Sequence, residues 1–203
     1  MSIVCLSFNQ EEYIESAIEG FLSQVTDYKL EIILADDAST DKTQEIIKKY
    51  AIKYPNIIKP IIRDSNIGPW LNWIEALDKA TGKYIAYCEG DDYWTDINKI
   101  QKQICFLEKH REYGLVWTDT DVLDLTKGII IKSIFSKNIL KSFTSFNEIL
   151  LNKPFLAPST WVFRSELSAY VLEIYDRDNH YVDGSFPFVL EVIRRHKIKY
   201  LPF

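Results

Sequence analysis

One stretch of the sequence joins an apolar run to an acidic turn: Lys83-Tyr84-Ile85-Ala86-Tyr87-Cys88-Glu89-Gly90-Asp91-Asp92. Its first six residues have the length and the aromatic and branched composition of a buried strand. The four residues that follow hold three carboxylates. Several negative charges are therefore expected at the point where this strand ends.

Two earlier apolar runs also end in polar side chains. The run Ile3 to Phe8 leads into Asn9, and the run Leu30 to Ala35 leads into Asp36-Asp37. Apolar residues at helical spacing separate the runs, which is typical of an α/β fold with a mostly parallel sheet. Ligands of such sheets bind beyond the carboxyl ends of the strands, near a change in strand order. We therefore expect a binding site at this edge.

Cap and breaker residues mark the other expected elements. Asn9 is expected to cap the first helix, with Glu12 reaching back to it, and Asp96 to cap a helix through Leu107. Pro60 places a strand over 57–62 at the edge of the sheet. The later chain is less regular: its candidate strands are 114–122, 129–135, 160–163 and 199–201, and its candidate helices are 146–151, 166–175 and 186–195.

The composition is that of a single globular domain. Of the 203 residues, 47% are hydrophobic and 26% charged, and the net charge of −5 argues against a nucleic-acid partner. Three cysteines without CxxC spacing favour neither a disulfide framework nor a zinc site. Cys5 and Cys88 lie in apolar runs as buried thiols, which suits a reducing, cytoplasmic location. The sequence has no signal peptide pattern and no apolar run of the roughly 18–20 residues that span a bilayer.

The acidic strand ends point to a divalent metal. Neighbouring carboxylates repel one another, so a cluster on one rim needs a cation or hydrogen-bond donors, and oxygen ligands select Mg²⁺ or Mn²⁺. The alternative is that each aspartate caps a helix or stabilises a turn. The seven glycines form neither GxGxxG nor GxxxxGK[ST], so a phosphate ligand would be held by the metal and not by a glycine loop.

Four segments in this order resemble those of a family-2 glycosyltransferase of the GT-A fold, over about the first 110 residues. They are Ile3–Asn9, Glu31–Asp41, Asn66–Gly68 with Asn72, Ala76, Ala80 and Gly82, and Tyr84–Trp94. Residues 159–164 and Asp183 with Phe186-Pro187-Phe188 also look like later segments of that family. The resemblance implies one GT-A domain over 1–203, with a donor half at 1–113 and an acceptor half at 114–203. Because the chain stops directly after an expected strand, the natural protein is expected to be longer.

The resemblance also implies roles for residues of the donor half. In such enzymes the aspartate after the second strand, here Asp37, recognises the base of the donor nucleotide, typically uracil in a UDP-sugar. Phe8 is expected beside that base, or else packed in the core. Asp91 and Asp92 are both candidate metal ligands: one of them is expected to bind the divalent metal, and the other is expected to contact the ribose. The remaining expected contacts with the nucleotide sugar are Ser7, Asn9, Asn66, Gly68 and Glu89, the last of which stands where many relatives have Asp.

An inverting, single-displacement transfer is the reaction that the family implies. A metal neutralises the diphosphate leaving group, a base deprotonates the acceptor hydroxyl, and water is excluded. Asp183 is expected to be the base, because it precedes an aromatic segment and the last helix as the family's base does. The alternative is that Asp183 caps that helix, with Asp119 and Asp121 as rival bases. Trp94 is expected to stack on a sugar or nucleotide ring.

The acceptor is expected to be a glycan or a lipid-linked sugar of a surface polysaccharide. Such a substrate would place the protein in the cytoplasm or at the inner face of the membrane, with peripheral contact. Two other readings stay open. One is a sugar-nucleotide-binding module without transfer activity. The other is a metal-dependent phosphohydrolase or nucleotidyltransferase, which is disfavoured because no Lys- and Arg-rich phosphate signature lies near the first strand.

Overall fold

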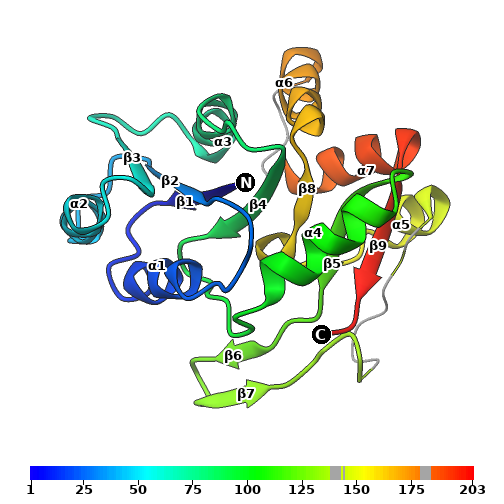
Figure 1. The fold of residues 1–203 in the computed structure, drawn as a ribbon, viewed down its shortest axis with the longest axis horizontal. Helices are drawn as coiled ribbons and strands as arrows, with labels where there is room; N and C mark the ends of the chain where they lie inside the picture. The colour runs from blue at the N-terminus through cyan, green and yellow to red at the C-terminus, as the bar shows by residue number, and fades with distance from the viewer. Residues whose placement is uncertain (138–142, 144, 179–183) are drawn as a thin grey trace.

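A seven-stranded sheet crosses the protein and carries helices on both faces (Figure 1). The structure is a computed structural model and describes residues 1–137, 143, 145–178 and 184–203. The strands of this sheet are β1 (Ser2–Ser7), β2 (Glu31–Asp36), β3 (Ile58–Ile62), β4 (Tyr84–Glu89), β5 (Tyr113–Thr118), β8 (Val162–Arg164) and β9 (Lys197–Leu201). Their order is β3-β2-β1-β4-β8-β5-β9, which confirms that β3 lies at an edge.

The strand pairing brings the polar strand ends together. β1 to β4 run parallel, with Ser7 opposite Asp36 on one side of β1 and Leu6 opposite Glu89 on the other. The chain builds outward from β1 to β2 and β3, then returns to place β4 on the opposite side of β1. The strand order therefore changes between β1 and β4, which is where open α/β sheets bind ligands.

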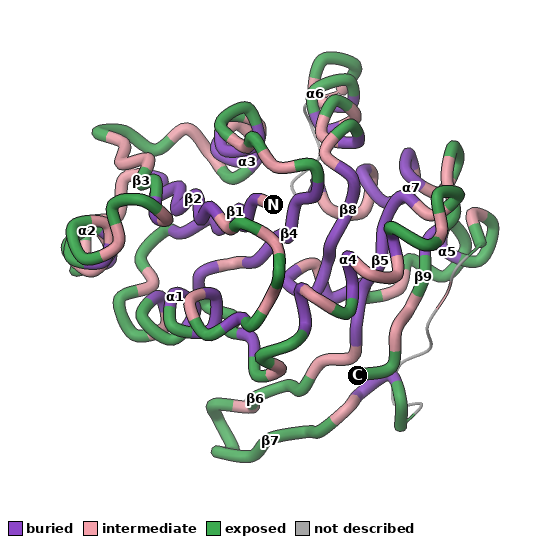
Figure 2. The backbone as a smooth tube through the Cα atoms, viewed as in Figure 1, coloured by how far each residue is buried: buried purple, intermediate pink, exposed green. Residues whose placement is uncertain are grey.

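Both faces of the central strands β1 and β2 are buried, as Figure 2 shows. Ile3 and Cys5 of β1 face a cluster with α1 (Ile14–Leu22), α2 (Thr43–Lys53) and α4 (Lys99–Lys109). Val4 and Leu6 face a cluster on the opposite side. That cluster includes α3 (Pro69–Asp78), α5 (Phe146–Asn152), α6 (Ser168–Arg177) and α7 (Ser185–Arg195). Each large apolar side chain buried there contributes roughly 1.5–3 kcal/mol relative to an exposed one.

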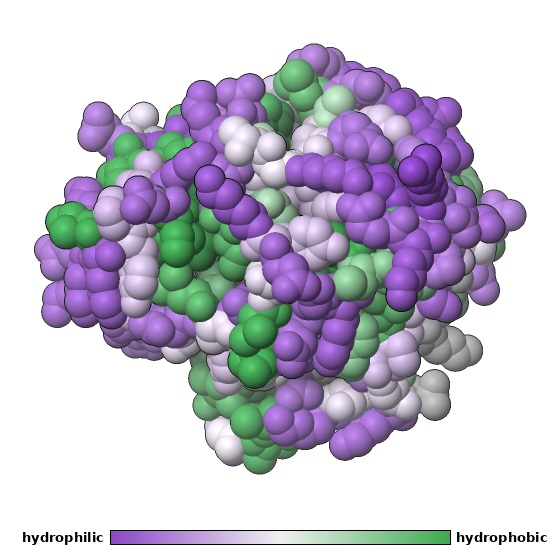
Figure 3. Space-filling view, in the orientation of Figure 1, coloured by the Kyte–Doolittle hydropathy of each residue, from purple (hydrophilic) through white to green (hydrophobic). Residues whose placement is uncertain are grey.

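A separate hairpin of β6 (Val122–Asp124) and β7 (Ile129–Ile131) projects from the main sheet. The strand predicted over 114–122 is divided in the structure, because β5 ends at Thr118 and the chain turns before β6 begins at Val122. The strand predicted over 129–135 is shorter than expected, because Asp119 accepts hydrogen bonds from the backbone N–H of Phe135 and Ser136 and turns the chain back. Figure 3 shows hydrophobic surface over this hairpin, whose exposed apolar residues are Val122, Leu123, Leu125, Ile129, Ile130 and Ile131.

Two predicted helix caps were wrong. Asn9 has a φ of 53°, and its Oδ1 accepts the backbone N–H of Thr40 at 2.8 Å, so it holds two loops together while α1 begins only at Ile14. Asp96 accepts the N–H of Asn98 at 2.9 Å, in a turn that precedes the first residue of α4. In both cases the side chain bonds to backbone outside the helix that it was expected to cap.

The cysteines agree with another expectation. Cys5 and Cys88 are free and buried, and the third cysteine is also a free thiol. Among the helices of residues 1–137, 145–178 and 184–203, none has the length and apolar character needed to cross a membrane.

Candidate active site

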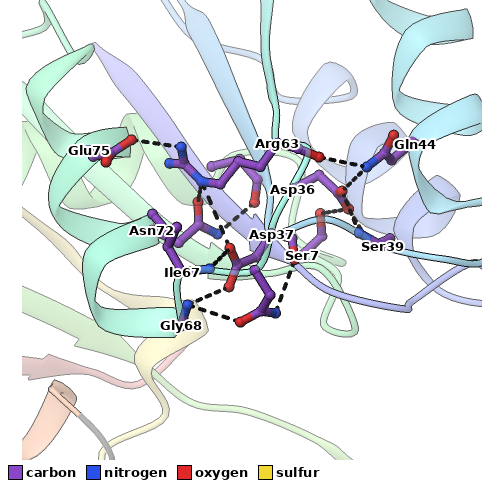
Figure 4. Close-up of polar contacts among 12 residues, drawn as sticks. Ser7, Asp36, Asp37, Ser39, Gln44, Arg63, Ile67, Gly68, Asn72 and Glu75 are labelled. Atoms are coloured by element: carbon purple, nitrogen blue, oxygen red, sulfur yellow. Dashed lines mark hydrogen bonds and ion pairs between the residues drawn. The ribbon is translucent and has the colours of Figure 1, made fainter.

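Asp37 follows β2 and binds the loop that leads into α3 (Figure 4). It is 3% exposed, and its carboxylate accepts the backbone N–H of Ile67 and of Gly68, each at 2.9 Å. The side-chain amide of Asn66 donates in turn to the carbonyl of Asp37 at 3.0 Å. Gly68 has a φ of 87°, a conformation that favours glycine, so the loop can turn here into the helix. The structure therefore brings together three predicted site residues, Asp37, Asn66 and Gly68.

Asp36 has a different environment from its neighbour. It is fully buried, and it accepts hydrogen bonds from the N–H of Ser39 at 2.9 Å, from Gln44 Nε2 at 2.9 Å and from Ser7 Oγ at 3.2 Å. These bonds fix the turn between β2 and α2. Because the Ser7 hydroxyl already donates to Asp36, the predicted contact of Ser7 with a ligand stays a prediction.

Phe8 and Asn9 lie at the end of β1, beside the loop that holds Ser39 and Thr40. Phe8 is 47% exposed, which excludes the alternative that it packs in the core, while its place beside a base stays a prediction. Ser39 Oγ accepts the backbone N–H of Asn9 at 2.8 Å, which together with the bond from Thr40 fixes the backbone after Phe8. An aromatic ring thus stands in solvent on a fixed loop at the carboxyl edge of the sheet.

Arg63 is a residue of this site that the sequence did not reveal. Its Nε donates to Asn72 Oδ1 at 3.1 Å and lies 3.9 Å from Asp37 Oδ1, while its Nη1 pairs with Glu75 at 2.7 Å (Figure 4). Its Nη2 is buried and has no hydrogen-bond partner among the described residues. A single arginine just after an edge strand carries no motif, so only the fold shows that it lies beside Asp37.

The acidic turn after β4 gathers three carboxylates. One oxygen each from Glu89, Asp91 and Asp92 lies within 4.8 Å of the others. The turn is fixed by the N–H of Gly90, which donates to the carbonyl of Leu6 at 2.9 Å. A Cβ at Gly90 would meet the ends of the Gln10 and Ile14 side chains, which would have to shift to make room for it.

The chemistry of this cluster suits a hard divalent cation. Three carboxylates supply the oxygen ligands that Mg²⁺ and Mn²⁺ prefer. Loss of hydration raises the pKa of Asp92, and the charge of Asp91 raises it further, although the hydrogen bond from Ser159 opposes both effects. A bound cation would relieve this repulsion, so the residues present fit the metal that the sequence analysis expects.

Ser159 is a second residue without a predicted role. It lies in a short 3₁₀ helix, η1 (Pro158–Thr160), and its Oγ donates to Asp92 Oδ2 at 2.5 Å. Trp94, which was expected to stack on a ligand ring, instead donates through Nε1 to the carbonyl of Ser159 at 2.7 Å. Trp94 is 7% exposed and packs edge-on against Phe21, with ring centroids 4.7 Å apart. The stacking prediction was therefore wrong, because the indole is part of the core.

A cavity of about 210 Å³ adjoins the acidic turn and shares Glu89 with it. Its walls come from β1, β4, α3 and the start of α7, and three of its lining residues are aromatic. The indole N–H of Trp73 is buried without a hydrogen-bond partner in the described part of the chain. The lining residues are Leu6, Pro69, Trp70, Trp73, Tyr87, Glu89, Gly184 and Ser185.

The candidate bases fall into two groups. Asp183 lies outside the described residues, although the next two residues of the chain line the cavity. Asp119 and Asp121 bind the chain around the β6–β7 hairpin: Asp121 accepts the N–H of Ser133 at 2.8 Å and pairs with Lys132 at 2.7 Å. Burial raises the pKa of each of these two carboxyls, but their hydrogen bonds outweigh it and lower the pKa below its usual value. Both carboxylates therefore have hydrogen-bond partners in the chain around the hairpin.

Two known proteins with related sequences show how far the similarity extends along the chain. An uncharacterised protein of Mycobacterium tuberculosis is 38% identical over 208 residues, which cover 97% of this chain and 59% of the relative. A UDP-Glc:alpha-D-GlcNAc-diphosphoundecaprenol beta-1,3-glucosyltransferase of Escherichia coli, WfaP, is 36% identical over 138 residues, which cover 67% of this chain and 51% of that protein. The chain thus spans about half to three fifths of the length of these relatives.

Solved structures share the fold. TarS of S. aureus (residues 1–349, in complex with UDP) matches with a TM-score of 0.69 at 21% identity, over 100% of this chain and 60% of TarS. The mannosyltransferase PcManGT of Pyrobaculum calidifontis, in complex with GDP-Man and Mn²⁺, matches with a TM-score of 0.72 at 16% identity, over 99% of this chain and 54% of that one. The likeness establishes the GT-A fold.

The sequence profile of glycosyl transferase family 2 matches residues 2–171, which is most of the chain. The predicted fold class and the predicted resemblance are thereby confirmed. The chain belongs to glycosyl transferase family 2.

Proposed function

We propose that this protein transfers a sugar from a UDP-sugar to a hydroxyl group of an acceptor, in a metal-dependent reaction that inverts the anomeric centre. The observation that carries the proposal is the position of the acidic cluster. Glu89, Asp91 and Asp92 lie at the change in strand order, beside a cavity and on the same edge of the sheet as Asp37. This arrangement would offer the diphosphate of a nucleotide sugar a metal site and offer its base a carboxylate.

Asp91 and Asp92 would hold the metal, with Glu89 beside them. When bound, Mn²⁺ or Mg²⁺ neutralises the charge of the diphosphate that leaves. The chain itself keeps this turn rigid through Gly90 and Ser159, so that the carboxylates need not reorganise when the charge develops.

We propose that Asp37 and its neighbours recognise uracil as the base of the donor. The Watson–Crick edge of uracil presents an N–H between two carbonyl groups. A carboxylate can accept that N–H, and a guanidinium can donate to a carbonyl. Asp37 and Arg63 lie side by side, and the buried Arg63 Nη2 is a donor without a partner among the residues described. Phe8 would cover the base, and Ser7, Asn9, Asn66 and Gly68 would shape its surroundings.

Transfer to an acceptor, rather than to water, would take place at the cavity. Its aromatic walls suit the apolar face of a sugar ring and limit access of water. We propose Asp183 as the base that accepts the proton of the acceptor hydroxyl. It directly precedes Gly184 and Ser185, which line the cavity, and its rivals Asp119 and Asp121 are already hydrogen-bonded to the hairpin.

The acceptor is proposed to be a glycan or a lipid-linked sugar, used in the cytoplasm at the inner face of the membrane. The E. coli relative is named for an acceptor attached to diphosphoundecaprenol. The exposed apolar residues of the β6–β7 hairpin are compatible with peripheral membrane contact. The competing function is a sugar-nucleotide-binding module without transfer.

The test combines donor binding with turnover. Thermal unfolding is measured with UDP, GDP and ADP, each with Mn²⁺ or with a chelator, because a ligand of the native state raises the unfolding temperature. Labelled UDP-sugars are then offered with lipid-linked and soluble glycans. Stabilisation by UDP with Mn²⁺ and labelled glycan product support the proposal. Binding without product in every acceptor series favours the binding module, and equal stabilisation by all nucleotides contradicts the uracil preference.

A further inference from the structure

The orientation of Asp92 depends on one hydroxyl from a distant part of the chain. Ser159 Oγ donates to Asp92 Oδ2 at 2.5 Å and accepts the backbone N–H of Glu89 at 3.2 Å. The N–H of Asp92 also donates to the carbonyl of Glu89 at 3.1 Å. Ser159 therefore ties the first and the last carboxylate residue of the acidic turn to each other.

Ser159 is itself fixed by buried contacts on both sides. Its carbonyl accepts the indole N–H of Trp94 at 2.7 Å, and the carbonyl of Thr160 accepts Gln103 Nε2 at 2.9 Å. The hydroxyl of Thr160 donates to the carbonyl of Ala157 at 2.8 Å and accepts the N–H of Thr118 at 3.2 Å. Ser159 is 7% exposed, so its side chain has little freedom to turn away from Asp92.

Two buried polar side chains of α4 pack beside η1 and Trp94. Lys99 Nζ donates to Gln103 Oε1 at 2.8 Å and lies 4.1 Å from the centre of the Trp94 ring. Lys99 is 4% exposed and Gln103 fully buried. Burying an ammonium and an amide costs free energy, which an apolar pair of similar size would avoid. Gln103 donates to the carbonyl of Thr160 in η1, and Lys99 contacts Trp94, which follows the acidic turn. The pair therefore supports both segments that hold Ser159.

We infer that Ser159 is a positioning residue, which holds the Asp92 carboxylate in the orientation that binds the divalent metal. The inference rests on the proposed function, since it takes Asp92 as a metal ligand. By occupying one lone pair of Oδ2, the hydroxyl restricts rotation of the carboxylate before the metal arrives. Outer-sphere partners of this kind typically change metal affinity by about 10–100-fold.

The test measures Mn²⁺ affinity directly, from the electron paramagnetic resonance signal of free Mn²⁺ with and without UDP. We expect Ser159→Ala to weaken binding by about 10–100-fold. Ser159→Thr keeps the hydroxyl and should recover most of the affinity. Ser168→Ala is the matched control, because its Oγ is also buried but has no hydrogen-bond partner within the described residues. Its Mn²⁺ affinity should equal that of the wild type.

The outcomes separate the two proposals. If the wild type binds Mn²⁺ with UDP and Ser159→Ala binds it equally well, the role of Ser159 is overturned alone. If Ser159→Thr is as weak as Ser159→Ala while both stay folded, the hydroxyl does not act in this way and the inference also fails. Ser159→Cys, which is close in size to serine and a weak donor, replaces the alanine variant if that one does not fold, and it should bind Mn²⁺ weakly. A wild type that binds no Mn²⁺ overturns the proposed function and this inference together.

Discussion

The carboxylate of Asp37 accepts the backbone N–H of Gly68 at 2.9 Å, although 31 residues separate the two. The bond fixes the loop before α3 against the end of β2, and the N–H of Ile67 adds a second bond to the same carboxylate. A side chain that serves the fold in this way can also face a ligand, since a carboxylate has about four acceptor sites. Asp37 therefore links the shape of the loop to the proposed recognition of the base.

Replacing Asp37 should abolish the preference for uracil. Asp37→Asn leaves one backbone N–H facing an amide N–H, so the free energy of unfolding should fall by about 1–3 kcal/mol. The additional stabilisation by UDP with Mn²⁺ over GDP with Mn²⁺ should disappear, as measured by thermal unfolding. Asp64→Asn, at an exposed position in the same loop, is the control and should keep the preference. A variant that still prefers UDP would show that the base is recognised elsewhere.

Removing one carboxylate from the acidic turn should abolish metal-dependent stabilisation. Asp91→Asn and Asp92→Asn each take a negative charge out of a repelling cluster, so the fold should not lose stability in chelator. In the presence of Mn²⁺ and UDP the rise in unfolding temperature should be lost, and transfer with it. Asp78→Asn, which removes only an exposed ion pair with Lys79, should behave as the wild type. Full turnover of both site variants in chelator would contradict a metal mechanism.

Asp183→Asn distinguishes a base from a helix cap. Asparagine keeps the size and the capping ability of aspartate but cannot accept the proton. If Asp183 is the base, transfer should slow by about 10²–10⁴-fold, while the affinity for UDP and Mn²⁺ stays unchanged. Initial rates with a labelled donor and an identified acceptor, together with a binding titration, measure both. Near-normal transfer by this variant would require another base.

Lys99 should make stability rise with pH above neutrality. Burial lowers the pKa of Lys99 to about 7 in the folded protein, although the negative charge of Asp96 opposes this shift. Between about pH 7 and 10 the unfolded chain therefore binds the additional proton, and the free energy of unfolding increases with pH by up to about 1.4 kcal/mol per unit. Urea unfolding at pH 7 and 8.5 should show this rise in the wild type. Lys99→Met should lose it, and Lys102→Met, at an exposed position on the same helix, should keep it.

Glu31 should contribute stability that is lost in acid. Burial alone would raise its pKa, but hydrogen bonds from Lys59, Ser2 and Thr81 lower it to about 2. Because the pKa is lower in the folded than in the unfolded protein, Glu31 adds to the free energy of unfolding above about pH 4.5. This contribution, at most about 3 kcal/mol, is lost as the pH falls towards 2. Glu31→Gln should be less stable at pH 7 and should flatten the acid limb of the unfolding curve. Glu45→Gln, an exposed control, should leave that limb unchanged.

The strands and the polar residues at their ends follow from local sequence. The apolar runs that lead into Asp36-Asp37 and into Glu89-Gly90-Asp91-Asp92 form β2 and β4 within one residue of the expected limits. Their side chains are buried on both faces, and such strands are continuous in apolar character whatever their neighbours. The edge position of β3 could also be predicted, because Pro60 has no N–H for a second neighbour.

The wrong predictions concern side chains whose partners are distant in sequence. Asn9 was expected to cap its own helix, and its partner is instead Thr40. Trp94 was expected to face a ligand, and its indole instead donates to Ser159, 65 residues away. Both residues have a plausible local role, so a pattern within a few residues cannot show which partner the folded chain supplies.

The sequence alone determined that a mostly parallel α/β sheet carries a cluster of carboxylates at the carboxyl ends of its strands. It could do so because each apolar run and the acidic residues that end it are neighbours in the chain. Only the tertiary structure decided which residues support that cluster. β8 enters the sheet antiparallel between β4 and β5, which carries η1 and Ser159 to Asp92, and the end of β3 brings Arg63 beside Asp37. Sheet order arises from packing between segments dozens of residues apart, and no single segment encodes it.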